Sequence, residues 1–252
     1  MCLSRYAGDV EPQRIVSLVP SLTELLFWLG AGERVVGRTK FCTEPAGEVE
    51  RIPALGGTKN PDVARIIQLR PDLVIANKEE NRREDIEALE GAGLRVLLTD
   101  PNTVTEAIEM ILIVGGVVSA GEKAQVLALD IALALAAVPD GELALVYVGV
   151  WHHPMMGLGG QSYGNSLIEA CGGRNVLCAR PRYPETSLDE IRSLAPRLIL
   201  LPDEPFPFDE SHTRVYSEIA PAQVIDGKLL WWYGARMPAA IRELSVLLGE
   251  YR

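Results

Sequence analysis

Three histidines are the side chains of this sequence best suited to metal chemistry, and all of them, His152, His153 and His212, lie in its second half. A transition-metal site shared between two halves usually draws imidazole or carboxylate ligands from both. The first half has no histidine, so we predict no dedicated zinc or manganese site. His152 and His153 are neighbours, and on extended backbone they should point to opposite sides, so that at most one faces a given pocket.

A glycine-rich stretch, GLGGQSYG at residues 157–164, has the look of a phosphate-binding loop. It lacks the Lys-Ser/Thr pair of a P-loop and the spacing of the dinucleotide fingerprint. We instead predict a flexible loop that faces the ligand, in which missing side chains let the backbone approach a bulky solute. Neither a nucleophile elbow nor a Ser-His-Asp order is visible, so no catalytic residue is predicted.

Aromatic residues are few, and they concentrate in loops of the second half. Proline and glycine interrupt the strand period in these stretches, so no strand requires the rings. Rings in loops indicate a stacking surface for a large flat or amphipathic ligand, although each could instead fill the core of its own lobe. The residues are Trp151, Tyr163, Tyr183, Phe206, Phe208, Trp231, Trp232 and Tyr233.

Alternating strands and helices position these loops, as in an α/β protein with a mostly parallel sheet. Apolar runs predict strands at 14–19, 35–37, 73–76, 95–98, 143–148, 198–201 and 223–225. Helical spacing predicts helices at 20–29, 61–69, 82–92, 103–118, 119–138, 164–171, 187–194 and 238–251. Serine or threonine followed three residues later by glutamate predicts capping boxes at Ser21, Thr103 and Ser119.

The two halves of the sequence resemble each other. Residues 66–75, IIQLRPDLVI, align with residues 191–200, IRSLAPRLIL, at a constant offset of 125 (191 − 66). Glu79 and Glu204 follow at the same offset, in loops at the carboxyl end of a strand, where α/β sheets bind ligands. A helix, a proline and a strand often occur together, so chance resemblance is the alternative.

We therefore predict two α/β lobes, each with a mostly parallel sheet flanked by helices, joined by one long backbone helix. The predicted boundaries are 1–118 for the first lobe, 119–138 for the helix and 139–252 for the second lobe. The alternative is an ordinary surface helix within one α/β domain. A helix without proline or glycine between Gly121 and Pro139 should resist wide hinge closure, and the ligand should lie in the cleft between the lobes.

The composition describes a globular protein, with 48% hydrophobic and 23% charged residues in 252. A net charge of −10 repels phosphate backbones and anionic membranes, so nucleic acid is not an expected partner. Residues 1–13 show no secretory signal, which predicts a cytoplasmic chain or a mature form. Four cysteines lack C-x-x-C spacing and are predicted to be free thiols; a bridge between Cys171 and Cys178 would need an oxidising compartment.

Three stretches together carry a family resemblance. Residues 14–24 (RIVSLVPSLTE), 69–75 (LRPDLVI) and 171–176 (CGGRNV) resemble the helical-backbone substrate-binding proteins of cobalamin and iron-siderophore ABC importers, most closely the cobalamin-binding type. The resemblance runs from about Arg14 to the C-terminus. It implies two lobes linked by one long helix, a ligand held between them and a location in the periplasm or at the cell surface.

The resemblance also implies docking onto a membrane permease through one acidic residue per lobe at a helix start. In the second lobe this position falls on Asp189, beside Glu190. In the first lobe it falls on Ala64, and the nearest carboxylate is Asp62. The first-lobe aromatic positions that flank cobalamin fall on Phe41, which is a ring, and on Thr58, which is not. These departures indicate a branch whose ligand or location differs.

The leading hypothesis is a non-enzymatic, monomeric binding protein without an intrinsic cofactor. It would hold a corrinoid, haem-like or ferric-chelate ligand for ABC-type uptake, with His152 able to reach the metal axially. An alternative is a cytoplasmic enzyme or sensor in cofactor salvage, and a third is a subunit-interaction role with an empty cleft. The predicted ligand contacts are Phe41, Thr58, Lys59, Trp151, His152, Tyr163, Phe206, Trp232, Tyr233 and Arg236.

Overall fold

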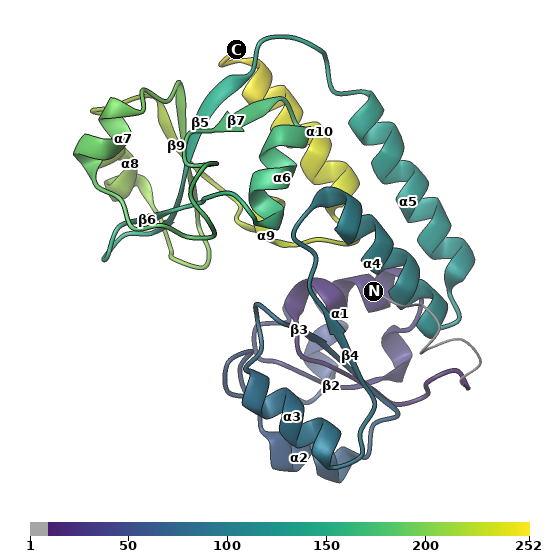
Figure 1. Cartoon of the computed structure of the whole chain (residues 1–252). Helices are drawn as coiled ribbons and strands as arrows, with labels where there is room; N and C mark the ends of the chain where they lie inside the picture. Colours follow the sequence, from purple (N-terminus) through teal and green to yellow (C-terminus); the bar gives the residue numbers. More distant parts are fainter. Residues whose placement is uncertain (1–9) are drawn as a thin grey trace. The chain divides into compact units, whose positions relative to one another are not determined.

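The computed structural model describes residues 10–252, so Cys2 lies outside the described residues (Figure 1). The chain forms two compact units. One comprises the residues up to Asp100 together with Ile108–Ala128, and the other comprises Pro101–Ala107 together with Leu129–Arg252. The division passes through α4 (Val104–Val117) and α5 (Gly121–Ala136). The boundaries predicted at residues 118 and 138 stay a prediction.

The first unit is built on a parallel sheet with the strand order β2-β1-β3-β4. These strands are β1 (Ile15–Ser17), β2 (Val35–Arg38), β3 (Leu73–Asn77) and β4 (Val96–Thr99). All residues of β1 and β3 are buried, as expected of central parallel strands that read as continuous apolar runs. The helices are α1 (Pro20–Trp28), α2 (Val63–Leu69) and α3 (Arg83–Gly91), with 3₁₀ turns at Gly32–Arg34 and Val49–Arg51.

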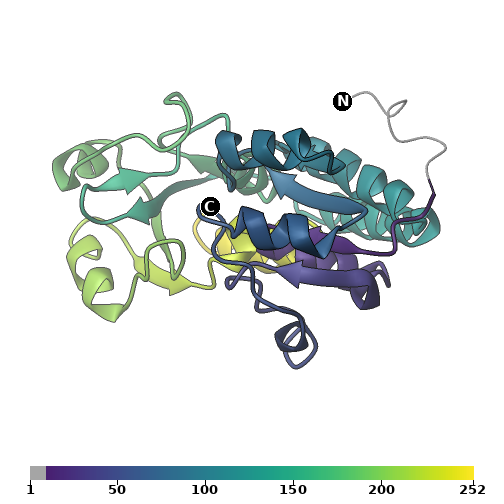
Figure 2. The same ribbon diagram turned by 90° about the horizontal axis from the view of Figure 1, so that it is seen from below.

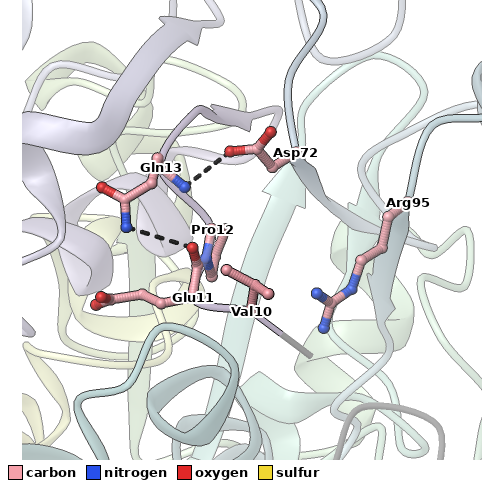
Figure 3. Close-up of a pocket in the computed structure, with 6 residues that line it drawn as sticks. All are labelled: Val10, Glu11, Pro12, Gln13, Asp72 and Arg95. Carbon is pink, nitrogen blue, oxygen red and sulfur yellow. Dashed lines mark hydrogen bonds between the residues drawn. The ribbon is translucent and has the colours of Figure 1, made fainter. Parts of the chain in front are cut away.

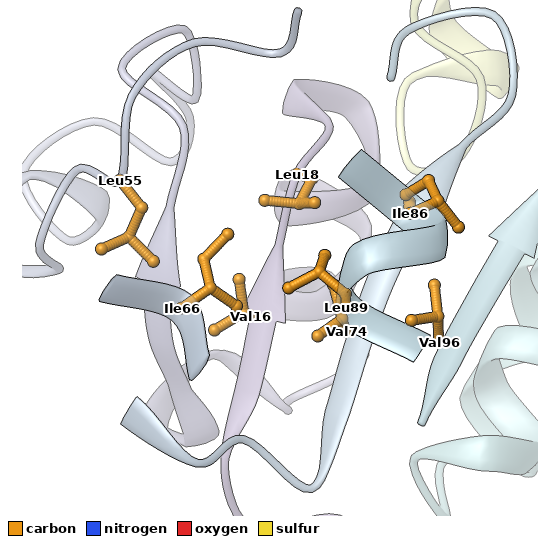
Figure 4. Close-up of a cluster of buried hydrophobic side chains, with 9 residues drawn as sticks. Val16, Leu18, Leu55, Ile66, Val74, Ile86, Leu89 and Val96 are labelled. Carbon is orange, nitrogen blue, oxygen red and sulfur yellow. The ribbon is translucent and has the colours of Figure 1, made fainter. Parts of the chain in front are cut away.

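The core of the first unit lies between its sheet and helices α2 and α3 (Figure 4). Alternate strand residues point to this face, and the helices add Ile66, Ile86 and Leu89. Burial of each aliphatic side chain of this size contributes about 1.5–3 kcal/mol. The cluster consists of Val16, Leu18, Leu55, Ile66, Val74, Ala76, Ile86, Leu89 and Val96.

The second unit has a parallel sheet with the order β7-β5-β8-β9, and β6 pairs antiparallel with the end of β5. The strands are β5 (Ala144–Trp151), β6 (Met156–Gly157), β7 (Gly173–Asn175), β8 (Leu198–Pro202) and β9 (Ala222–Ile225). The helices are α6 (Tyr163–Ala170), α7 (Leu188–Ser193), α8 (Glu210–Tyr216), α9 (Lys228–Trp231) and α10 (Met237–Gly249). Figure 2 shows α8 beside β9. The sequence did not predict β6, β7, α8 or α9.

The internal repeat predicted from the sequence is confirmed. The orders β2-β1-β3-β4 and β7-β5-β8-β9 follow the same path, and α2 with β3 corresponds to α7 with β8 at the offset of 125. Ile66 and Ile191 occupy equivalent, fully buried core positions. Arg70 and Ala195, also 125 apart, both have a positive φ of 47° where the chain leaves the helix.

The capping box predicted at Ser119 is wrong, because this serine ends α4 instead of beginning α5. Ser119 has φ 57°, its N–H bonds to the Gly116 oxygen at 3.3 Å, and Ala120 N–H bonds to the Gly115 oxygen at 2.7 Å. This pair of bonds closes the C-terminus of a helix. The first α5 bond, from Ala124 N–H, runs to the Ala120 oxygen. The helix has 16 residues, not 20, and spans about 24 Å.

Of the other two predicted helix caps, the one at Ser21 is absent and the one at Thr103 is present. Helix α1 begins at Pro20 after Val19, without a side-chain cap, so Ser21 is not an N-cap. Proline suits this first helical position because its missing N–H would be unpaired there anyway. The Thr103 cap is present, since its hydroxyl accepts the Glu106 N–H at 3.1 Å.

The three cysteines of the described residues, Cys42, Cys171 and Cys178, are free thiols, as predicted. Burial raises the pKa of Cys171 to about 12, so this thiol is held in its neutral form. Within residues 10–252, no helix combines the length and apolar character that crossing a membrane would require.

Candidate functional site

Aromatic and imidazole rings gather where β5 and β8 end, at the carboxyl edge of the second sheet. The Phe206 ring lies at the centre of the group, with its centroid 5.3 Å from Trp151, 4.8 Å from Phe208 and 5.3 Å from His212. Most of these contacts are edge-to-face, which is a favoured geometry for aromatic pairs. We call this group the ring cluster: Trp151, His152, His153, Phe206, Phe208, His212 and Tyr216.

The prediction that His152 and His153 point to opposite sides is wrong. Strand β5 ends at Trp151, and the two histidines lie in the turn that leads to β6. Because a turn does not alternate its side chains as a strand does, the two rings are in contact, with centroids 4.2 Å apart. The turn is further held by Trp151 Nε1, which donates to the His153 backbone oxygen at 2.9 Å.

His152 is partly buried and contacts several other rings of the cluster. His212 lies 4.7 Å away in edge-on contact, and the His152 Nδ1 atom is buried without a hydrogen-bond partner. Burial lowers the pKa of His152, and the neighbouring His153 and His212 lower it further. His152 therefore favours its neutral form.

Asp209 holds His212 in place at the start of α8. The Asp209 carboxylate accepts from Ser211 and contacts His212 Nδ1 at 2.8 Å in a reciprocal capping box. These hydrogen bonds, led by those from Ser211 and His212, lower the pKa of Asp209 to about 2. An ionised Asp209 at neutral pH thus fixes the orientation of one ring of the cluster.

A second group surrounds Trp232, which follows α9. Two cations contact its ring, with Lys228 Nζ and Arg236 Cζ each 5.2 Å from its centroid. The indole N–H donates to the Glu204 carboxylate at 2.8 Å. Burial raises the pKa of Glu204, while the bond from Trp232 opposes the rise. The structure thus brings together the predicted residues Trp232 and Arg236 with Glu204, which the sequence placed only in a ligand-side loop.

The predicted rings differ in how far solvent reaches them. Trp151 is 39% exposed, whereas Tyr163, Trp232 and Tyr233 are 5%, 6% and 8% exposed. The Tyr163 and Tyr233 rings meet edge-to-face at 5.5 Å, and the Tyr163 hydroxyl is buried without a partner. These two tyrosines fill space within their own unit, so their role as ligand contacts stays a prediction.

The glycine-rich stretch at 157–164 does not form the predicted flexible loop. The N–H groups of Gly157, Gly159 and Gly160 donate to backbone oxygens of residues 180–184 at 2.7–3.0 Å. A Cβ at Gly160 would lie 2.2 Å from the Cys178 oxygen, and one at Gly159 would lie 2.3 Å from the Arg180 oxygen. The glycines therefore allow close approach of the neighbouring backbone rather than of a solute, and the occupied N–H groups cannot cradle a phosphate.

In the first unit, Phe41 lies next to the loop that carries Thr58 and Lys59. The Phe41 side chain is 51% exposed, and its ring edge would be 3.2 Å from a Cβ built at Gly57. Thr58 is 9% exposed, and its backbone oxygen accepts from Asn81 Nδ2 at 3.0 Å. Lys59 Nζ donates to the Glu79 backbone oxygen. The structure thus gathers the three predicted first-lobe residues into one loop region.

Asn81 is a site-supporting residue that sequence reasoning did not find. Its side chain bonds to the backbone of Leu18, Thr58 and Asn77, which follow or end three separate segments of the first unit. It is 5% exposed, so these bonds satisfy a buried amide. A polar residue placed shortly after a buried strand was the only available signal.

The carboxylates expected at the docking positions sit at helix starts. Asp62 is the N-cap of α2, immediately before Val63. Its side chain accepts the Arg65 N–H at 3.0 Å. Asp189 lies in the first turn of α7, and its side chain is 94% exposed beside Arg192. Glu190 is instead held by Arg180 at 2.6 Å and by the Thr186 hydroxyl. Asp189 is the more accessible of the two neighbours.

A surface pocket of about 370 Å³ lies in the first unit, lined by Val10, Glu11, Pro12, Gln13, Asp72 and Arg95 (Figure 3). Asp72 lines it and accepts the N–H groups of Gln13 and Arg14 at 2.8 and 2.9 Å. These residues precede β3 and β1. Ligands of open α/β sheets bind outside the carboxyl ends of the strands, so this amino-edge pocket is not the candidate site. Among residues 10–252, no three histidine, cysteine or acidic side chains are arranged to hold a metal ion.

The chain thus has two α/β units of one strand topology, and rings gather at the carboxyl edge of the second sheet. Residues 15–220 match the periplasmic binding protein family, and the chain belongs to that family. By its family it is a solute-binding protein and not an enzyme, as the sequence predicted.

Several relatives and solved structures are similar to the chain. The vitamin B12-binding protein of Photorhabdus laumondii is 24% identical over 205 residues, covering 79% of this chain and 72% of the relative. The ABC transporter substrate-binding lipoprotein YvrC of Bacillus subtilis is 29% identical over 204 residues, covering 77% and 64%.

The solved structures show the same fold. The periplasmic heme-binding protein RhuT of Roseiflexus sp. RS-1 has a TM-score of 0.81 at 21% identity, over 95% of this chain and 98% of that one. The periplasmic vitamin B12-binding protein BtuF of Vibrio cholerae has a TM-score of 0.79 at 18% identity, also over 95% and 98%.

Proposed function

We propose that this protein binds a metal tetrapyrrole, of the corrinoid or heme type, and presents it to an ABC permease. The observation that carries the proposal is the ring cluster at the carboxyl edge of the second sheet. A large flat ligand is recognised mainly by stacking and apolar contact, which rings supply with few freely rotating bonds. The names of the relatives, which include vitamin B12-binding and heme-binding proteins, support the same ligand class.

Exposed rings are available for such stacking in both units. Trp151 is 39% exposed in the ring cluster, and Phe41 is 51% exposed in the first unit. Each aromatic contact with a ligand ring is worth about 0.5–1.5 kcal/mol. Where the ligand lies relative to the two units, and whether His152 reaches its metal, stay predictions.

The ligand proposal is tested by titrating the protein with cyanocobalamin and with hemin while following tryptophan fluorescence and the visible absorbance of the ligand. Trp151→Ala should weaken binding of the preferred ligand by about 2- to 12-fold. Trp28→Ala is the matched control, because Trp28 is 38% exposed at the far end of α1, away from the carboxyl edge. Equal losses in the two variants would contradict the proposal.

Permease docking is supported most directly by Asp189, whose side chain is almost fully exposed in the first turn of α7. Its counterpart in the first unit at the offset of 125 is Ala64, so docking would rest on the second unit's carboxylate and on Asp62. Asp189→Ala should reduce the ligand-loaded protein's stimulation of ATP hydrolysis by a vitamin B12 or heme permease in proteoliposomes. Glu243→Ala, an exposed change on α10, is the control; a similar loss in both would contradict this assignment.

A further inference from the structure

Glu204 holds two neighbouring indoles through two different groups. Its backbone oxygen accepts from Trp231 Nε1 at 2.6 Å, and its carboxylate Oε1 accepts from Trp232 Nε1 at 2.8 Å. An indole has one polar hydrogen, so each bond uses the full hydrogen-bonding capacity of its ring. A single residue after β8 thus orients both Trp231, the last residue of α9, and Trp232, which follows the helix.

Close packing of two loops makes this arrangement possible. A Cβ at Gly227 would lie 2.4 Å from Glu204 Cγ and 2.9 Å from the Glu204 oxygen, so only glycine fits there without displacement. The Gly227 N–H donates to the Asp203 carboxylate at 2.8 Å, and Asp203 N–H donates to the Ile225 oxygen at 3.0 Å. Two hydrogen bonds of Asp203, the residue before Glu204, therefore join the loop after β8 to the segment before α9.

The orientation of Trp232 passes on to Arg236. Arg236 and Lys228 both lie 5.2 Å from the Trp232 ring centroid, within the range of a cation–π contact. A hydrogen bond to a carboxylate is roughly twice as strong as one between neutral groups, so Glu204 is a firm anchor for the ring. The Trp232 ring is 6% exposed and is held at its N–H by Glu204, so the Arg236 guanidinium packs against a ring of fixed orientation.

The first unit repeats part of this design. Glu79, at the offset of 125 from Glu204, accepts Lys59 Nζ on its backbone oxygen, just as Glu204 accepts Trp231. In both units, the backbone oxygen of the glutamate that follows the repeated strand accepts a hydrogen bond from a side chain of a neighbouring segment. The second unit adds the bond from the carboxylate to Trp232.

We infer that Glu204 is a positioning residue of the solute-binding face, which orients Trp232 and, through that ring, Arg236 toward the ligand. The inference rests on the proposed function of this edge of the second unit. It assigns to Glu204 no ligand contact of its own. Loss of its carboxylate should therefore act on ligand binding only while Trp232 is present.

A double-mutant cycle tests this coupling with cyanocobalamin and hemin as probes. Glu204→Ala should weaken binding of the preferred probe by about 10-fold, the effect of losing one charged hydrogen bond. Glu204→Gln keeps an acceptor oxygen and should stay within about threefold of the natural protein. In a Trp232→Phe background, Glu204→Ala should change affinity by less than about twofold. Glu218→Gln, an exposed change after α8, is the matched control.

A ligand-free readout separates this inference from the proposed function. Glu204→Ala should reduce the near-ultraviolet circular dichroism of the indoles, and Glu204→Gln should largely restore it, with far-ultraviolet spectra unchanged. An unaltered near-ultraviolet spectrum, or an equal affinity loss with and without Trp232, would overturn the inference. If the natural protein binds neither probe, the proposed function fails, and the near-ultraviolet spectra still decide whether Glu204 positions Trp232.

Discussion

Replacement of Phe206 is the most informative change to the ring cluster. Its ring contacts Trp151, His152, Phe208 and His212, with centroid distances of 4.8–5.9 Å. Phe→Ala in a full core costs about 3–5 kcal/mol, and because Phe206 is only partly buried we expect about 2–3 kcal/mol of lost unfolding free energy. Loss of its aromatic contact with the ligand, and of support for Trp151, should weaken binding by about 0.5–1.5 kcal/mol, or 2- to 12-fold.

Urea unfolding and ligand titration separate these two effects. Phe206→Leu keeps apolar volume and should recover much of the stability, yet it should still bind the tetrapyrrole more weakly because the ring is missing. Val246→Ala, at a 69% exposed position of α10, should change neither quantity appreciably. If folded Phe206→Ala bound as tightly as the natural protein, the ring cluster would be a structural core alone and our reasoning would be refuted.

Three further predictions address the fold and its electrostatics. Ile66→Ala and Ile191→Ala empty equivalent, fully buried positions, so each should lower the unfolding free energy by about 2–5 kcal/mol in urea; a negligible cost for either would argue against equivalent cores. Acidification below pH 6.5 should lower Tm, because the unfolded chain, with an ordinary histidine pKa of about 6.5, takes up a proton that folded His152, with its lowered pKa, resists. The stability that neutral His152 contributes is thus fully present above that pH and is lost as the pH falls below it. The Tm of a His152→Phe chain should fall less between pH 7.5 and 5.5, and an identical pH dependence of Tm in the two chains would contradict this prediction. Gly160→Ala should lower Tm because its Cβ would lie 2.2 Å from a backbone oxygen, whereas Gly116→Ala, in open space on α4, should not; equal melting temperatures would contradict the packed loop.

The sequence predicted the parts of the fold that depend on local patterns. Continuous apolar runs located β3 and β8, and the repeat at an offset of 125 carried the topology of one unit to the other. The short elements β6, β7, α8 and α9 were missed because they contain only 2–7 residues and carry little periodicity of their own. Partners distant in sequence stabilise them, as Asp203 does for the start of α9.

The errors at Ser119 and Gly160 have a related cause. A serine followed by glutamate three positions later fits a helix start, but the same serine can end the preceding helix, and the pattern does not distinguish the two. The glycines at 157–160 indicate either a flexible backbone or close packing against it, but the sequence does not show whether a ligand or another segment of the chain packs there. In the candidate site, Trp232 was predicted because it is an aromatic residue in a loop. The role of Glu204 depends on its hydrogen bond with Trp232, 28 residues away in sequence, and no local pattern predicts such a bond.

The central claim, that this chain binds a metal tetrapyrrole, is tested most directly by native mass spectrometry. The purified chain would be incubated with cyanocobalamin, hemin and a ferric chelate in separate samples and then freed of excess ligand. We predict one bound corrinoid or heme per chain, displaced only by the other tetrapyrrole. Apo masses in the two tetrapyrrole samples, or retention of the ferric chelate alone, would contradict the claim.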